Sequence, residues 1–191
     1  MIPVKTTEDQ RTAYTRAIVS TWTSATADQE RRGRAWYVTA HELAAEIAAG
    51  DVKRGAGVLA ALSANKPWGE NCKIAARAFQ EGKATGHVRD ALTKADRIMA
   101  GADPAEVLPM HLKTGLFYRC IADPQDVEPV VIDRHAHDIA VQEIYGNRDR
   151  GLGALGRYNT LADCYRTAAR EIGEIPSVVQ AVTWVAHIER D

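Results

Sequence analysis

Hydrophobic residues recur at the three- and four-residue spacing of amphipathic helices along almost the whole chain. Near the start, Thr7 and Gln10 have the spacing of a capping box, and the apolar positions after them predict a helix over residues 8–24. A second, longer helix follows, with Trp36 in its apolar stripe and Gly50 at its end. The first quarter of the chain is therefore expected to be helical.

The middle of the chain continues this pattern in shorter segments. The nearly all-apolar run 58–62 predicts a buried helix, and Pro67 suits the first turn of the next one, which Gly82 ends. Thr85 is positioned to cap a further amphipathic helix that stops at Gly101. This apolar spacing places Val88 on the buried face of that helix.

Two helix starts in the second half lie close to reactive side chains. After a short helix that begins with Asp103 and Pro104, the chain turns and restarts as a helix at Lys113. The apolar residues 130–132, the one strand-like stretch, lead into another helix start at Asp133. Two final helices follow a Gly- and Arg-rich loop at 147–158.

The pattern as a whole predicts an all-α fold with about nine or ten helices. Residues 1–191 are expected to form a single compact helical unit, with N-terminal helices in residues 1–54 and the remaining helices in 55–191. The N- and C-terminal helices should pack together and leave a cleft against the middle helices, with Lys113 and Asp133 at its edge.

Composition and charge narrow the class of protein. The chain has 191 residues, 46% hydrophobic and 26% charged, which is typical of a globular protein. Its 24 Lys and Arg residues face 25 acidic ones, so it lacks the bulk positive charge of a strong duplex binder. Any nucleic-acid site must be a local patch, and the candidates are the arginines near Asp133: Arg134, Arg148, Arg150 and Arg157. Arginines in a polar loop are more often simply solvated.

Cysteine and histidine positions argue against disulfides and a metal centre. Three widely spaced cysteines, Cys72, Cys120 and Cys164, fit reduced thiols. His135 and His137 point about 200° apart on a helix, so they do not share a metal ion and no metal site is predicted. With no signal peptide and no long apolar run, the chain is expected to be cytoplasmic and not to bind a membrane.

Lys113 and Asp133 form a plausible reactive pair. The positive end of a helix favours the neutral, nucleophilic form of a lysine if the site is also partly dry, and it favours the carboxylate form of an aspartate. An amine can attack a carbon, and an anion can orient it or stabilise a nearby cation. The ordinary interpretations are an N-cap for Asp133 and a surface side chain for Lys113.

The surrounding sequence favours the functional interpretation, because it resembles the helix-hairpin-helix DNA glycosylase superfamily, the endonuclease III-like fold. The family segment Leu-Pro-Gly-Val-Gly-x-Lys-Thr-Ala is similar to residues 108–115, which form the candidate hairpin. The family's apolar run followed by Val-Asp-Thr-His is similar to residues 130–135. An upstream block, residues 57–63 followed by Asn71, agrees in order, and the resemblance covers residues 55–190.

This resemblance implies a role for each matching position. Asp133 corresponds to the catalytic aspartate, and Lys113 to the lysine that attacks the sugar carbon in members with lyase activity. The implied substrate-binding residues are Ser63, Asn65, Trp68, Asn71, His111, Arg134 and His135. The candidate DNA-backbone contacts are Thr114 and Gly115 in the hairpin, together with Arg148, Arg150 and Arg157 of the arginine patch. The partner would be DNA, with no cofactor. Trp68 could equally stack on an extruded base or pack on the core.

Two departures from the family pattern keep other functions open. Met110 and Leu112 replace the hairpin glycines that let backbone N–H groups approach a phosphate, and there is one residue fewer before the lysine. The four-cysteine iron–sulfur cluster of several relatives is absent from the sequence. The first alternative is a bacteriophage-type enzyme that hypermodifies thymine in DNA, displacing pyrophosphate from activated 5-hydroxymethyluracil with an amine or amino acid. The second is a non-catalytic descendant of the fold that binds DNA or a protein partner.

Overall fold

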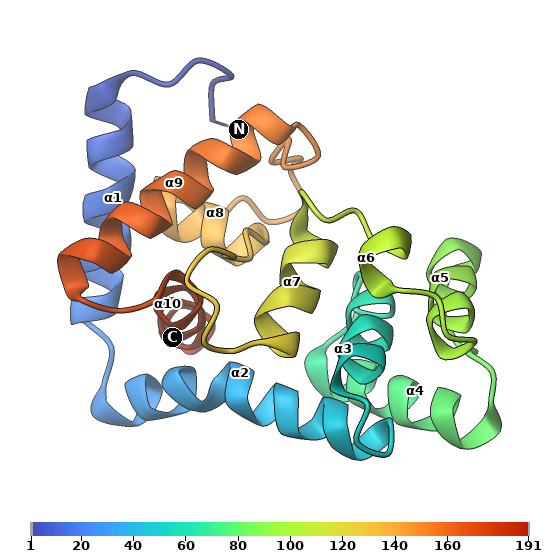
Figure 1. The fold of residues 1–191 in the computed structure, drawn as a ribbon. Helices are drawn as coiled ribbons and strands as arrows, with labels where there is room; N and C mark the ends of the chain where they lie inside the picture. Colours follow the sequence, from blue (N-terminus) through green and yellow to red (C-terminus); the bar gives the residue numbers. More distant parts are fainter. Residues whose placement is uncertain (1, 191) are drawn as a thin grey trace. The chain divides into compact units, whose positions relative to one another are not determined.

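A computed structural model describes residues 2–190 and confirms the all-α prediction. Ten helices and no strand occur over these residues (Figure 1). The helices are α1 (Glu8–Thr23), α2 (Ala27–Ile47), α3 (Val52–Ala61), α4 (Trp68–Glu81), α5 (Arg89–Met99), α6 (Pro104–Val107), α7 (Lys113–Ala122), α8 (Arg134–Val141), α9 (Leu155–Ile172) and α10 (Pro176–Ile188).

Contacts divide the chain into two compact units. Unit 1 comprises Met1–Tyr37 and Gln125–Asp191, and unit 2 comprises Val38–Pro124. The sequence had instead suggested one compact unit, with its N-terminal helices ending at residue 54. The division falls inside α2, where the sequence has no break in helical periodicity, so the pattern gave no sign of a boundary there.

Unit 1 brings the two ends of the chain together, as expected. In it α1 contacts α8, α9 and α10, and α10 also contacts α8 and α9 (Figure 1). A close approach joins α2 to α10: a Cβ added at Gly33 would lie 2.4 Å from the Val182 Cα, so no larger residue fits there without movement. These contacts make a helical bundle that supports α8 and the segment before it.

Unit 2 is built around α3, which contacts α4, α5, α6 and α7. All residues of α3 from Gly55 to Ala61 are buried, in agreement with the nearly all-apolar run in the sequence. Gly55 allows α3 to approach α2, since a Cβ there would lie 2.0 Å from the Ala44 carbonyl oxygen. This unit carries Lys113 at the start of α7.

Helix boundaries differ from the sequence prediction in two places. The helix predicted to start at Thr85 begins at Arg89 instead, with Val88 as its N-cap. Val88 is 64% exposed, so its place in the apolar spacing did not reflect burial. The loop predicted to reach Tyr158 ends at Ala154, and Tyr158 is a buried residue of α9.

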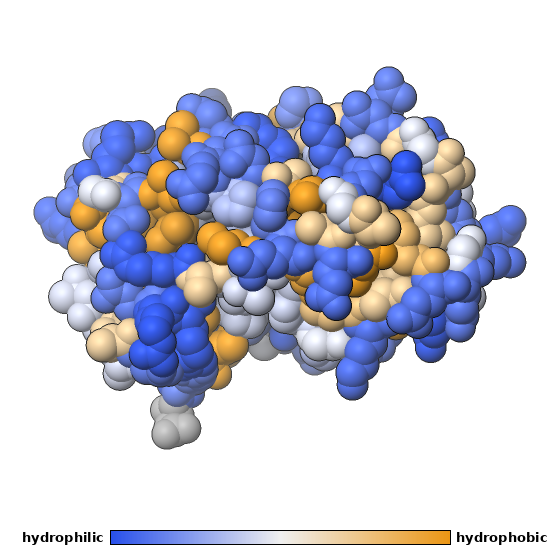
Figure 2. All heavy atoms as spheres, turned by 60° about the horizontal axis from the view of Figure 1, so that its bottom comes forward, coloured by the Kyte–Doolittle hydropathy of each residue, from blue (hydrophilic) through white to orange (hydrophobic). Residues whose placement is uncertain are grey.

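Hydrophilic residues cover much of the face drawn in Figure 2, and apolar residues gather between them in patches, the broadest on the right of the view. Across residues 2–190, every helix is too short or too polar to cross a bilayer.

Candidate functional site

A buried segment without regular secondary structure leads the chain into Asp133. Val130, Val131 and Ile132 are at most 4% exposed. The Tyr158 hydroxyl accepts a hydrogen bond from the Ile132 N–H at 2.9 Å and donates one to the Val130 carbonyl at 3.2 Å. The segment predicted as the one strand-like stretch is neither strand nor helix, and a tyrosine from α9 bonds to two of its backbone groups in place of a neighbouring strand.

Asp133 is the N-cap of α8, as predicted. Its Oδ1 accepts hydrogen bonds from the backbone N–H groups of His135 at 3.0 Å and Ala136 at 2.8 Å. Among residues 2–190, no hydrogen bond reaches Oδ2 of this half-buried carboxylate. One oxygen thus fixes the carboxylate against the helix, and the second is left for another group.

A hollow of about 310 Å³ adjoins this cap in unit 1. We call it the α8–α10 hollow. It is lined by α8, the following loop and the end of α10, through Arg134, His135, Asp138, Ile144, Gly146, Asn147, Arg150, His187 and Ile188. The His135 ring lies edge-on to the rings of His187, at 5.5 Å between centroids, and Trp184, at 6.1 Å. The hollow therefore contains two predicted substrate-binding residues, Arg134 and His135.

A buried ion pair forms one side of the hollow. Arg150 donates from Nε and Nη2 to the two oxygens of Asp138, at 2.8 and 2.6 Å. His137 Nδ1 and the Tyr145 N–H also bond to this carboxylate, at 2.9 and 3.1 Å. Burial acts to raise the pKa of Asp138, but the hydrogen bonds from Arg150, His137 and Tyr145 outweigh it and hold the pKa at about 2.

The histidines of this region are neutral at pH 7. Burial lowers the pKa of His135, His137 and His187. The His187 Nδ1 atom is buried and has no hydrogen-bond partner among the described residues. Within residues 2–190 no group of three or more His, Cys, Asp or Glu side chains is arranged to hold a metal ion.

Lys113 lies in unit 2 and is the first residue of α7, as predicted. Its side chain is exposed, so it lacks the partly dry surroundings that the sequence interpretation required for a neutral amine. His111 is exposed beside it and Thr114 is half-buried. Gly115 is buried, and this contradicts its predicted contact with DNA: a Cβ there would lie 2.3 Å from the Met110 Cα. The glycine instead allows the hairpin backbone to pack on α7.

The other predicted substrate-binding residues of unit 2 lie around the loop between α3 and α4. The Ser63 hydroxyl donates to the Ala60 carbonyl, and Asn65 has a left-handed backbone with φ 56°. Asn71 is 1% exposed and donates from Nδ2 to the Leu59 carbonyl at 3.0 Å. The Trp68 ring packs edge-on to Phe117 at 6.1 Å, which is the core-packing alternative for this residue.

The predicted arginine patch is largely engaged within the protein. Arg150 is held by Asp138, and Arg157 donates to the Ile2 carbonyl at 2.9 Å. Arg148 donates to Glu143 and lies over the Tyr145 ring, 4.0 Å from its centroid. Arg150, 10% exposed, is thus withdrawn from the expected contact with a DNA backbone. Arg134 differs, since its exposed guanidinium contacts only His135 Nε2, at 3.1 Å, among the described residues.

Two residues of α10, His187 and Trp184, were not predicted from the sequence, and their rings contact the His135 ring. Their three-residue separation places them on one face of α10, but nothing local indicated which helix they face.

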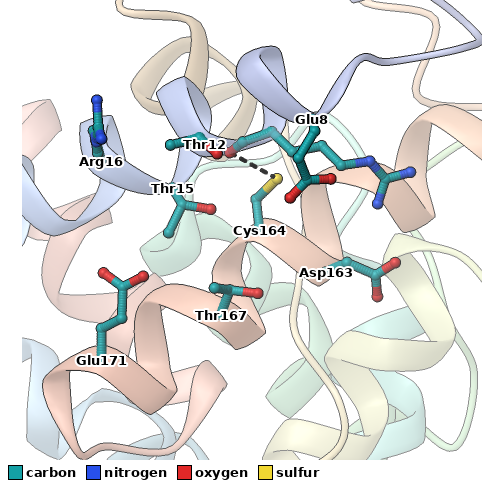
Figure 3. Close-up of a pocket in the computed structure, with 9 residues that line it drawn as sticks. Glu8, Thr12, Thr15, Arg16, Asp163, Cys164, Thr167 and Glu171 are labelled. Carbon is teal, nitrogen blue, oxygen red and sulfur yellow. Dashed lines mark hydrogen bonds between the residues drawn. The ribbon is translucent and has the colours of Figure 1, made fainter.

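A second hollow of about 350 Å³ lies between α1 and α9 in the same unit. Figure 3 shows Cys164 at its centre, among threonines and ionised side chains of both helices. The thiol is 3% exposed and contacts the Arg11 carbonyl at 3.7 Å, and burial raises its pKa. A protonated thiol is a poor nucleophile, so this hollow offers weaker chemistry than the first. Cys72, Cys120 and Cys164 are all free, as predicted.

Comparison with known proteins identifies a family but no characterised relative. No curated protein and no solved structure matches the chain significantly. The sequence model of DUF7178, a family of unknown function, matches residues 1–191. The chain therefore belongs to the DUF7178 family.

Proposed function

We propose that the chain acts on a base in DNA in the manner of helix-hairpin-helix DNA N-glycosylases. The observation that carries this proposal is the environment of Asp133. Its carboxylate follows a buried segment, is fixed through Oδ1 by two backbone N–H groups of α8, and has Oδ2 free of hydrogen bonds among residues 2–190. Helix starts at Lys113 and Asp133 support the proposal, since the family resemblance puts its reactive lysine and aspartate at helix starts.

In the proposed reaction, the target base is extruded from the duplex and its glycosidic C–N bond breaks. The leaving base takes the bonding electron pair and a proton, and positive charge develops on the sugar. The Asp133 carboxylate stabilises this charge through Oδ2, or orients the water that attacks the sugar carbon and loses a proton. In the lyase version, the amine of Lys113 attacks in place of water and forms a Schiff base. Because Lys113 is exposed, the proposal depends on Asp133 more than on the lyase step.

A second candidate is the bacteriophage-type modification of thymine. It is favoured by the near-neutral charge of the chain and by Met110 and Leu112 in the hairpin, which suit a specialised enzyme better than a genome-scanning one. An amine would attack the methylene carbon of pyrophosphorylated 5-hydroxymethyluracil, the C–O bond would break, and pyrophosphate would leave with the electron pair. Asp133 would accept the proton of the incoming amine while the base stays attached.

The non-catalytic alternative makes a different use of the same residues. It interprets Asp133 as a cap only, which its two Oδ1 hydrogen bonds fit. It also requires Lys113 to be buried, and Lys113 is exposed. A functional experiment must therefore separate capping from chemistry.

Asp133→Asn makes that separation, because asparagine caps helices about as well as aspartate but carries no charge. Wild type, Asp133→Asn, Lys113→Ala and the control Lys83→Ala, another exposed lysine of unit 2, would be incubated with labelled duplexes. These duplexes carry uracil, 5-hydroxymethyluracil, its pyrophosphate ester, oxidised purines or an abasic site, and parallel mixtures also contain amino acids and polyamines as amine donors for the transferase reaction. Borohydride trapping and nucleoside mass spectrometry would identify the products.

Each outcome assigns one function. Base release that Asp133→Asn abolishes establishes a glycosylase, and a trapped adduct that is lost in Lys113→Ala but kept in Lys83→Ala adds the lyase step. A mass change on a base that stays attached establishes the transferase. DNA binding with no product from any duplex would overturn both enzymatic candidates and leave the non-catalytic one.

A further inference from the structure

We infer that the α8–α10 hollow is a phosphate-binding site that takes a phosphate group of the bound nucleic acid. The inference rests on the proposed DNA function only for the source of the phosphate. The site itself consists of side chains that line the hollow, Arg134 and His135 on α8 and His187 on α10.

The charge balance of the hollow favours an anion. The Asp138 carboxylate is neutralised by the two hydrogen bonds from Arg150, with both side chains at most 10% exposed. Arg134 keeps its positive charge without a carboxylate partner among the described residues. A guanidinium with N–H groups available at the mouth of a hollow is a typical phosphate ligand.

The two imidazoles supply further donors. His135 Nε2 accepts a hydrogen bond from Arg134 Nε at 3.1 Å, so the neutral ring carries its proton on Nδ1. His187 lines the same hollow with a half-buried ring, and because its Nδ1 is buried, the ring would offer Nε2–H to a phosphate. A phosphate accepts hydrogen bonds from both rings, and the negative charge favours their protonation. The charged groups near these rings are Asp133, Asp138, Arg134, Arg150 and Arg190.

The backbone of α8 does not compete for the anion, because Asp133 already accepts hydrogen bonds from its first N–H groups. Two exposed apolar residues, Ile144 at 78% and Ile188 at 42%, belong to the lining. They would contact the sugar or base beside a phosphodiester but contribute nothing to a free phosphate. The volume of about 310 Å³ fits a phosphate with part of its sugar.

Histidine-detected NMR tests the site in the wild-type protein without any variant. Inorganic phosphate and a 15-base-pair duplex would be titrated separately at pH 7, and the ring nitrogen signals of His135 and His187 followed. We expect both titrants to shift both rings, and the duplex to act at a lower concentration because it adds contacts outside the hollow. His41, in unit 2 and bonded to the Ile121 carbonyl, serves as the internal control.

Variants then measure the contribution to DNA binding. Arg134→Gln should reduce the magnitude of the slope of log affinity against log salt by about one, the value for one lost phosphate contact. His187→Gln should weaken binding several-fold, with the greater loss at pH 6 than at pH 8, because a bound phosphate favours the protonated ring. Arg31→Gln is the matched control, since this 73% exposed arginine of unit 1 lies outside the hollow's lining.

The results separate failure of the site from failure of the function. Duplex binding with unshifted rings and unchanged slopes in Arg134→Gln would overturn the phosphate site and leave the DNA function standing. Ring shifts with inorganic phosphate but no duplex binding would support an anion site and overturn both the DNA source and the proposed function. Unshifted rings with both titrants would overturn the site for either source.

Discussion

Arg150 closes onto Asp138 with two hydrogen bonds, so the loop after α8 is held to the helix that Asp133 caps. Tyr145 contacts the same residues of α8: its N–H donates to Asp138, and its ring lies edge-on to the His137 ring, at 4.6 Å between centroids. The pair therefore determines the position of one wall of the α8–α10 hollow.

Removing one member of this pair should destabilise the protein strongly. Asp138→Ala leaves the guanidinium of Arg150 without its carboxylate, and we expect a loss of about 3–5 kcal/mol in the free energy of unfolding. Urea denaturation measures it. Glu143→Gln is the control: it breaks the exposed Arg148–Glu143 pair and should cost less than about 1 kcal/mol. Similar losses in the two variants would show that Asp138 and Arg150 contribute no more than a surface pair.

The same carboxylate should make stability depend on acid pH. Its folded pKa of about 2 lies below the unfolded value of 3.8, so its contribution is complete above pH 3.8 and is lost as pH falls towards 2. The shift corresponds to about 2 kcal/mol. Urea unfolding of wild type and Asp138→Asn between pH 5 and pH 2 should show a stability difference that shrinks by this amount. A difference independent of pH would contradict the ion pair.

Histidines should add a second, milder acid sensitivity. The pKa values of His135, His137 and His187 are lowered by burial, so the unfolded chain binds protons first as pH drops below 6.5. Stability should therefore fall from pH 7 to pH 5, before Asp138 titrates. His137→Gln should flatten this part of the profile, whereas His111→Gln, in an exposed position of unit 2, should leave it unchanged. A wild-type profile flat between pH 7 and pH 5 would refute this assignment.

Gly115 should tolerate no side chain. An alanine Cβ would meet the Met110 Cα at 2.3 Å and the Pro109 carbonyl oxygen at 2.6 Å, so the hairpin must move, at a cost of about 1–3 kcal/mol. Gly69→Ala is the matched control in the first turn of α4, where nothing lies within 4 Å of the new Cβ, and it should stabilise by up to about 1 kcal/mol. Thermal unfolding measures the stability change in each variant. Equal changes in Gly115→Ala and Gly69→Ala would contradict the packing role of Gly115.

Cys72 should react slowly despite its partial exposure. Burial raises its pKa to about 11, so at pH 8 its thiolate fraction is roughly two hundredfold below that of a free cysteine with its pKa near 8.5. Alkylation with iodoacetamide, followed by peptide mass spectrometry, should show a correspondingly slow rate at Cys72. A rate equal to that of free cysteine would contradict the assigned environment.

Local signals explain how much of this structure was predictable. Thr7 with Gln10 forms the predicted capping box, and Asp103 and Asp133 cap the predicted helices, because a cap depends on residues within one helical turn. Asp138 with Arg150 was not predictable, since the partner lies across a loop whose path is set by tertiary contacts. His187 and Gly115 were missed or misassigned for the same reason: a periodic pattern identifies a face but not what covers it.

The most direct test of the proposed function is the single-turnover rate of Asp133→Asn on the duplex that wild type processes. Asparagine retains the cap on α8, so folding and DNA affinity should match wild type within about twofold. The proposal predicts a loss of rate of at least about a hundredfold, the typical contribution of a charge positioned at the reacting bond. An unchanged rate, with the same product, would contradict the assignment of Asp133 as the catalytic carboxylate.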